Sequence, residues 1–236
     1  MGKKYRRVLL KVSGEFLMGD QGFGLDVKTI NHVANEVADI HKEGYQICVV
    51  MGGGNIFRGI SAATYGMHRA IADNIGMLAT VMNSLAFQNS MEKLGIQTRV
   101  MSAISMPTIC EPYIRRKAMR HLDKGRVVIC AAGSGNPYFT TDTAAALRAL
   151  ETGCEVLMKA TKVAGVYTSD PEMDKDATFI EKISYKDAID KNIRVMDQTA
   201  ITLAKENGIP IIIFSIKETG ILKKILTSGG LCSVIS

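Results

Sequence analysis

The chain has 236 residues, of which 47% are hydrophobic and 22% are charged, a balance typical of a folded globular protein and not of a disordered or fibrous one. That length allows one large domain with a substantial core. Lys and Arg (29) exceed Asp and Glu (23), which gives a formal charge of +6. This excess suits a polyanionic ligand, but charge alone does not choose among nucleic acid, an acidic membrane surface and small phosphates.

Cysteine and histidine usage argues against a disulfide framework and a structural metal. The five cysteines are scattered without a C-x-x-C pair, and the four histidines lack the spacing of metal ligands. We therefore expect free thiols in a reducing cytoplasm and no dedicated protein ligands for a metal. The longest apolar stretch, 75–87, is short and is interrupted by Asn83 and Ser84, so neither a secretion signal nor a membrane span is expected.

Short apolar runs alternate along the chain with segments of helical periodicity. Strands are predicted over 7–12, 46–51, 97–101, 126–131, 156–159 and 210–214. Helices are predicted after a cap at Asp26, over 71–93, after the cap-type residues at 140–142, after Asp197, and over 218–226. Because most of the strands are apolar on both faces, we expect an α/β protein whose largely parallel sheet is covered by helices on each side.

Three glycine-containing segments stand where a predicted strand ends and a helix begins, at 11–14, 52–59 and 133–142. Glycine lets backbone N–H groups approach an anion, and the start of a helix adds partial positive charge. Several such turns indicate more than one phosphate-bearing ligand. Neither the Walker A pattern GxxxxGK[ST] nor a complete GxGxxG fingerprint is present, which argues against a P-loop kinase and against NAD binding.

Two cations beside these glycines, Lys11 and Arg58, favour phosphoryl transfer, a reaction in which positioning and charge neutralisation supply most of the acceleration. The alternatives are an ordinary strand lysine and a surface arginine. Asp142 fits either a helix cap or a carboxylate that orients Lys11 or another cation. Asp73 fits either an acid in the first turn of a helix or an acceptor for ribose hydroxyls.

The segments 11–15, 52–59, 76–83, 135–142 and 159–163 together resemble the bacterial uridylate kinases of the amino acid kinase family, from Lys4 nearly to the C-terminus. The resemblance implies one domain, 1–236, folded as a three-layer αβα sandwich around an open sheet. It also implies that the N-terminal half mainly binds UMP and the C-terminal half mainly ATP, with a soft division near 153. The implied reaction is direct transfer of the γ-phosphoryl of MgATP to UMP, which gives UDP and ADP in pyrimidine nucleotide biosynthesis, with Mg²⁺ carried by the nucleotides.

The same resemblance assigns site residues. Catalytic roles are implied for Lys11, Arg58 and Asp142. ATP contacts are implied for Lys11, Val12, Ser13, Gly14, Gly54, Arg58, Thr161, Tyr167 and Asp170. UMP contacts are implied for Gly53, Asp73, Ser134, Gly135, Asn136, Pro137, Tyr138, Phe139, Thr140 and Thr141. Three positions depart from the family pattern: Ser134 replaces a common threonine, Tyr138 a common phenylalanine, and Ala164 a common aspartate, which removes a charge near the ATP half.

Regulation and assembly are further implications of the resemblance. The segment Gly19, Asp20, Gln21, Gly22, Phe23 and Gly24 resembles a loop associated with activation by GTP, and its alternative interpretation is a simple glycine hairpin. The family also implies inhibition by UTP and a homohexamer, with the helix at 71–93 contributing to subunit contacts.

Three rival functions stay open at this point. One is a related kinase acting on acetylglutamate, carbamate or aspartate. Another is a nucleotide sensor or storage-type homologue that has lost the transfer reaction. The third, a basic regulator that binds nucleic acid, is disfavoured because the basic clusters lack an aromatic-interleaved reading surface.

Overall fold

A nine-stranded sheet forms the centre of the computed structural model, which describes residues 4–57, 66–169, 171, 173–193 and 195–236. The strand order is β4-β3-β5-β2-β1-β6-β10-β11-β9, and all neighbouring pairs are parallel except β10 with β11. The bounds are β1 (Arg7–Val12), β2 (Gln46–Met51), β3 (Thr98–Ser102), β4 (Glu111–Pro112), β5 (Val127–Ala131), β6 (Val156–Thr161), β9 (Lys182–Ile183), β10 (Ile211–Ser215) and β11 (Ser233–Ile235). A separate two-stranded antiparallel sheet joins β7 (Val166–Tyr167) to β8 (Phe179–Ile180).

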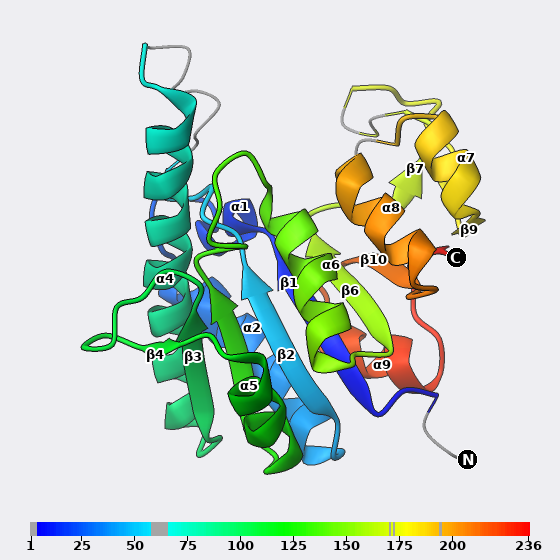
Figure 1. The fold of residues 1–236 in the computed structure, drawn as a ribbon. Coiled ribbons are helices and arrows are strands. Elements are labelled where there is room, and N and C mark those ends of the chain that lie inside the picture. The colour runs from blue at the N-terminus through cyan, green and yellow to red at the C-terminus, as the bar shows by residue number, and fades with distance from the viewer. Residues whose placement is uncertain (1–3, 58–65, 170, 172, 194) are drawn as a thin grey trace.

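Helices cover both faces of this sheet, as Figure 1 shows. One face carries α2 (Val27–Lys42), α4 (Arg69–Lys93) and α9 (Ile221–Thr227), together with the short α1 (Gly14–Leu17). The other face carries α5 (Arg115–Asp123), α6 (Thr141–Thr152), α7 (Tyr185–Asp190) and α8 (Gln198–Glu206). The predicted three-layer αβα sandwich with a largely parallel sheet is confirmed, and each of the six predicted strands is found within two residues of its expected bounds.

The two-residue period of the strands separates the two halves of the core. Val8, Leu10 and Val12 of β1 pack into the core on the α2 and α4 face, whereas Leu9 packs into the core beneath α5, α6 and α8. The same alternation directs Lys11 of β1 toward α6. On β6, Leu157 packs on the α6 face, so Lys159, two residues further on, projects to that face as well.

The helix caps follow the sequence with one exception. The side chains of Asp26, Thr140 and Asp197 accept N–H groups at the starts of α2, α6 and α8. The last helix begins at Ile221 and not at 218, because Gly220 precedes it in a left-handed conformation (φ 78°). The buried Glu36 of α2 accepts the N–H groups of Gly220 and Leu222, so a residue distant in sequence supplies this cap.

Several elements were not predicted. Helix α5 buries only Ala118 and Leu122, so its strongly basic sequence offers too few apolar positions to mark it as a core helix. The two- and three-residue strands β4, β7, β8, β9 and β11 are too short to give a sequence pattern. Within the described ranges, α4 is the one helix whose length and apolar composition would also suit a membrane span. It contacts α2, β2, β3 and β5, which is the position of a core helix.

Candidate active site

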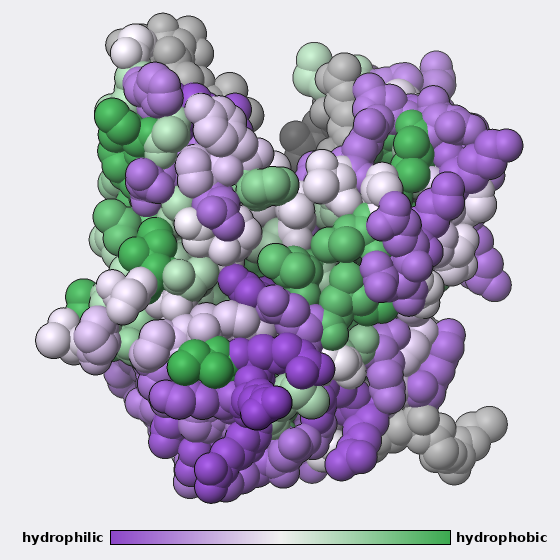
Figure 2. Space-filling view, viewed as in Figure 1, coloured by the Kyte–Doolittle hydropathy of each residue, from purple (hydrophilic) through white to green (hydrophobic). Residues whose placement is uncertain are grey.

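The glycine turns and the two lysines meet where the parallel strands end. β2, the next strand along the chain, lies on one side of β1, and β6 lies on the other side. The direction in which the chain adds strands to the sheet therefore reverses between β1 and β6. In open α/β sheets, ligands bind beyond the carboxyl ends of strands at such a switch point. Figure 2 shows the surface hollowed between the upper part of α4 and the lobe that carries α7 and α8.

Three buried charged groups lie at this switch point. Lys11 and Lys159 are partners in the register of β1 and β6. Asp142, in the first turn of α6, lies between them: its Oδ1 is 2.8 Å from Lys11 Nζ, and its Oδ2 is 2.5 Å from Lys159 Nζ. All three residues are at most 8% exposed. One carboxylate thus holds two ammonium groups side by side and leaves a net charge of +1 at the site.

The electrostatics of these three groups are mutually dependent. Burial by itself opposes ionisation of Asp142, but the ammonium groups of Lys11 and Lys159 outweigh it and hold the pKa of this carboxyl well below its ordinary value. Burial lowers the pKa of Lys159, and the charge of Asp142 opposes that shift only in part. The carboxylate therefore stays ionised at neutral pH, where it orients the two cations and does not act as a general base.

The N-terminus of α6 is fixed by Asp197, the residue that caps α8. Thr140 caps α6 by accepting the N–H groups of Asp142 (3.2 Å) and Thr143 (3.3 Å). The Thr140 hydroxyl in turn donates to the carboxylate of Asp197, and the Thr143 hydroxyl donates to the same group at 2.9 Å. Asp197 also accepts the N–H of Ala200 at 2.8 Å and so caps α8. The positive end of α6 is thereby held rigidly beside the lysines.

The turns after β1 and β2 approach each other so closely that only glycine fits. A Cβ on Gly14 would lie 2.6 Å from the backbone N of Gly54, and one on Gly52 would lie 2.7 Å from the backbone N of Gly14. A Cβ on Gly53 would lie 2.7 Å from the carbonyl oxygen of Gly76 in α4. The two phosphate-binding turns predicted from sequence are therefore packed against each other next to Lys11.

A second part of the site joins α4 to the loop before α6. The Nε of Arg69 donates to both carboxylate oxygens of Asp73 (2.9 and 2.8 Å), and Asp73 also accepts the N–H of Tyr138 at 2.8 Å. Tyr138 has a positive φ of 73°, and the guanidinium of Arg69 lies 5.9 Å from the centre of its ring. The Ser134 hydroxyl closes a small turn with the N–H and carbonyl of Asn136. The predicted UMP residues 73 and 134–141 thus gather at one place.

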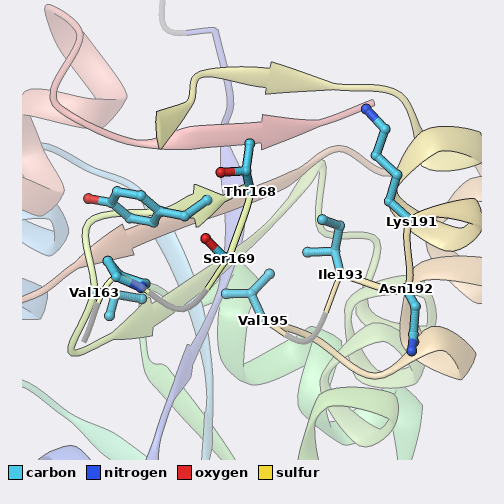
Figure 3. Close-up of a pocket in the computed structure, with 10 residues that line it drawn as sticks. Val163, Thr168, Ser169, Lys191, Asn192, Ile193 and Val195 are labelled. Carbon is cyan, nitrogen blue, oxygen red and sulfur yellow. The ribbon is translucent and has the colours of Figure 1, made fainter. Parts of the chain in front are cut away.

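A cavity of about 570 Å³ lies next to Lys159, in the part of the chain that follows β6. Its walls come from the segment that follows β6 and the segment that follows α7, as Figure 3 shows. Tyr167 lines it, and Lys159 reaches its edge by donating to the carbonyl of Val195. Thr161 does not line it: its hydroxyl closes the turn to Val163, which does. A mostly apolar cavity of this size is suited to a nucleoside.

Loop 19–24 joins α1 to α2, so it is not a hairpin between strands. Gly19, Gly22 and Gly24 all have positive φ, and Phe23 is 67% exposed. Gly24 and Asn55 exchange backbone and side-chain hydrogen bonds at 2.8 Å. Asn55 is also paired with Asn83, which donates to the carbonyl of Gly52. A buried amide pair therefore connects this loop to the glycine turn after β2.

Residues 6–215 match the sequence profile of the amino acid kinase family. The chain belongs to the amino acid kinase family. It is 54% identical over 233 residues to the uridylate kinase of Paramagnetospirillum magneticum, covering 99% of this chain and 97% of that protein. It is 55% identical to the uridylate kinase of Ehrlichia ruminantium, with 98% and 96% covered.

Solved structures agree with this membership. The UMP kinase of Bacillus anthracis superposes with a TM-score of 0.94 at 39% identity, covering 98% of this chain and 96% of that one. The UMP kinase of Ureaplasma parvum superposes with a TM-score of 0.92 at 36% identity, over all of both chains. This amino acid kinase is therefore a phosphotransferase, and the family resemblance seen in its sequence is confirmed.

The structure brings together most of the predicted site residues of this amino acid kinase. Lys11, Val12, Ser13, Gly14 and Gly54 lie at the adjoining turns after β1 and β2. Arg58 and Asp170 lie outside the described residues. Ala164 stands between two residues that line the cavity, Val163 and Gly165. The catalytic and binding roles of all these residues stay predictions.

Sequence reasoning overlooked two residues of the site. The sequence predicts Lys159 only as part of a strand and of the family resemblance, and the signal that points to a functional role is a lysine within an otherwise apolar strand. The sequence predicts Asp197 only as a helix cap. Its hydrogen bonds to Thr140 and Thr143 could not be predicted from the sequence, because they join residues more than 50 positions apart.

Proposed function

We propose that this protein is a uridylate kinase that transfers the γ-phosphoryl group of MgATP to UMP, giving UDP and ADP in pyrimidine nucleotide biosynthesis. The observation that carries the proposal is the Lys11–Asp142–Lys159 cluster at the switch point, between a nucleoside-sized cavity and the loop that gathers the predicted acceptor residues. The names of its relatives at 54–55% identity support UMP as the acceptor.

The chemistry follows from charge and position. Two nucleotides that react end to end repel each other through their phosphates, and two fixed ammonium groups lower that repulsion where the phosphoryl group moves. The backbone N–H groups of the glycine turns and the start of α6 add fixed dipoles. Asp142 is held ionised between two lysines, which does not suit a nucleophile, so we propose direct in-line transfer without a phosphoenzyme.

Magnesium fits this site as part of the substrate. Within the described ranges there is no group of three His, Cys, Asp or Glu side chains that could hold a metal ion. Asp142, the carboxylate nearest the lysines, has its two oxygens engaged by ammonium groups. Mg²⁺ would therefore arrive on the phosphates of ATP, where it supplies further neutralisation of charge.

The two nucleotides are proposed to occupy different halves of the single domain. The cavity is built from residues after 153, which supports ATP binding by the C-terminal half. Asp73 and the loop at 134–141 precede that division, which supports UMP binding by the N-terminal half. Tyr167 and the backbone around Ala164 would contact the ATP nucleoside.

The test is turnover with a panel of acceptors in a coupled assay for ADP release. We expect UMP to be phosphorylated much faster than the other nucleoside monophosphates, and carbamate, aspartate and acetylglutamate to give no signal. A response to one of those last three, but not to UMP, would favour a different kinase of the family. Binding of ATP and UMP without ADP release would indicate a sensor, and salt-dependent DNA binding in place of turnover a nucleic-acid regulator.

We also propose activation by GTP through loop 19–24 and inhibition by UTP. The bonds from Gly24 through Asn55 to Asn83 support a link from this loop to the glycine turn after β2. Phe23→Ala removes an exposed ring and is expected to weaken the GTP response while leaving the basal rate unchanged. An unaltered GTP response in this variant would place the effector elsewhere.

A homohexamer in the cytoplasm is the remaining proposal. Ile71, Leu78 and Met82 of α4 are 48–54% exposed, which supports a contact between copies along that helix. All five cysteines are free thiols, which supports a reducing compartment. Light scattering with Met82→Lys tests the contact: a smaller assembly is expected, and an unchanged mass would exclude this part of α4 from the interface.

A further inference from the structure

A buried arginine lies behind the loop that leads into α6. Arg148 of α6 is 5% exposed, and its guanidinium lies 3.9 Å from the centre of the Tyr113 ring. One of its terminal nitrogens donates to Glu151 at 2.6 Å, and the other donates to the carbonyl of Gly133 at 3.3 Å. Its Nε is buried without a hydrogen-bond partner. A buried charge with an unsatisfied N–H is weak evidence for a stabilising role.

The backbone that Arg148 holds is strained. Ala132, Gly133, Gly135 and Tyr138 all have positive φ, at 60°, 56°, 83° and 73°. Two of these four are not glycine, and such conformations persist only where the surroundings fix them. The fixing contacts are spread along the loop: Thr80 accepts the N–H of Ala132 at 2.8 Å, and Asp73 accepts the N–H of Tyr138. Arg148 supplies the contact between these two.

The contact from Arg148 determines the direction of one peptide group. The described chain has no cis peptide bond, so the carbonyl of Gly133 and the N–H of Ser134 point in opposite directions. Because the carbonyl is drawn toward the guanidinium in the interior, the Ser134 N–H points away from it, to the side of the loop opposite Arg148. A backbone N–H presented in this way is a hydrogen-bond donor available to a ligand bound at the loop.

We propose that Arg148 is a positioning residue for the acceptor nucleotide: it holds the Gly133 carbonyl inward and thereby presents the Ser134 N–H to the nucleoside monophosphate bound at the loop 134–141. This inference rests on the proposed function, because it takes UMP to be the acceptor. It assigns Arg148 no contact with either nucleotide.

The test compares Arg148→Met with Glu151→Gln. Both remove the ion pair between Arg148 and Glu151, but only the first removes the hydrogen bond to Gly133. We expect Arg148→Met to raise the KM for UMP about tenfold and to leave the KM for ATP within twofold. Arg148→Lys is expected to recover part of the loss, and Glu151→Gln to lower stability with both KM values near wild type. Equal effects of the two variants on the KM for UMP, or equal rises in both KM values, would overturn the proposal.

A second measurement does not depend on turnover. In wild-type protein labelled with ¹⁵N, titration with UMP should shift the Ser134 amide resonance strongly, and the shift should be smaller in Arg148→Lys, which recovers only part of the function. This variant keeps a cation in the same place, so it also covers the case in which Arg148→Met fails to fold. An equal shift in both proteins would refute the role of Arg148. Wild-type protein that neither binds nor phosphorylates UMP would instead refute the proposed function.

Discussion

Lys11 and Lys159 are direct neighbours across β1 and β6, and both of their ammonium groups contact the carboxylate of Asp142. Two like charges on facing positions of adjacent strands would ordinarily repel each other. Here the shared carboxylate of Asp142 offsets this repulsion and keeps both ammonium groups at the carboxyl edge of the sheet. The excess positive charge is therefore available to phosphate groups that enter the site.

Replacing Lys11 should impair turnover much more than folding. In Lys11→Ala, Asp142 still has Lys159 as its partner, so no buried charge is left unpaired. Loss of one fixed cation from the transfer site should lower kcat at least about 100-fold, as for other preorganised electrostatic groups. Steady-state kinetics alongside thermal melting checks this, with Lys28→Ala on the surface of α2 as the control. Near-normal kcat in Lys11→Ala would remove this lysine from the mechanism.

Replacing Asp142 should instead affect folding more than turnover. Asp142→Asn leaves two buried ammonium groups without their counter-charge, which is expected to cost about 3–5 kcal/mol of stability. Urea unfolding at pH 7 measures this loss. Since the pKa of Asp142 is lowered in the folded protein, its stabilisation is complete above the ordinary value of 3.8 and is lost as pH falls through the folded value. The difference in the free energy of unfolding between wild type and Asp142→Asn should therefore narrow at acid pH. A difference that does not change with pH would contradict the assignment.

Alkaline pH should affect activity through Lys159. Its folded pKa is lowered by burial, so it loses its proton at a pH below that of an ordinary lysine. The neutral form of Lys159 no longer contributes a positive charge to the site. We therefore expect kcat to fall with rising pH, and to do so below the ordinary pKa of a lysine. Because the unfolded chain retains this proton to higher pH, the contribution of Lys159 to stability should rise across the same interval. In Lys159→Arg this alkaline fall in kcat should move to higher pH. A fall at the same pH as in wild type would mean that another group causes it.

The turn after β1 should not accept a side chain. In Gly14→Ala the new Cβ would lie 2.6 Å from the backbone N of Gly54, so one of the two turns must move. Both kcat and the affinity for ATP are expected to fall, since the turn carries donors to its phosphates. Gly76→Ala in α4 is the matched control: nothing lies within 4 Å of its Cβ, and the change should stabilise the helix by about 0.5–1 kcal/mol. Calorimetric titration with ATP distinguishes the two variants, and normal ATP affinity in Gly14→Ala would contradict the assignment of this turn.

The sequence by itself determined the layers of this protein. Runs such as 46–51 and 126–131, apolar on both faces, required a buried parallel sheet, and Asp26 and Asp197 marked helix starts that the structure confirms. These features are local, because each depends on residues a few positions apart. The glycines at the strand ends likewise predict anion binding at the carboxyl edge of the sheet, and this stays a prediction.

Only the tertiary structure decided which charges meet at that edge. Lys159 joins Lys11 because β6 inserts beside β1, Asp197 steadies α6 because α8 packs against it, and Arg148 reaches Gly133 from inside the fold. Each of these contacts joins segments whose separation in the chain bears no relation to their distance in space. Strand order and helix packing set them, and a pattern read along one strand or one helix contains no information about the strand that will pair with it.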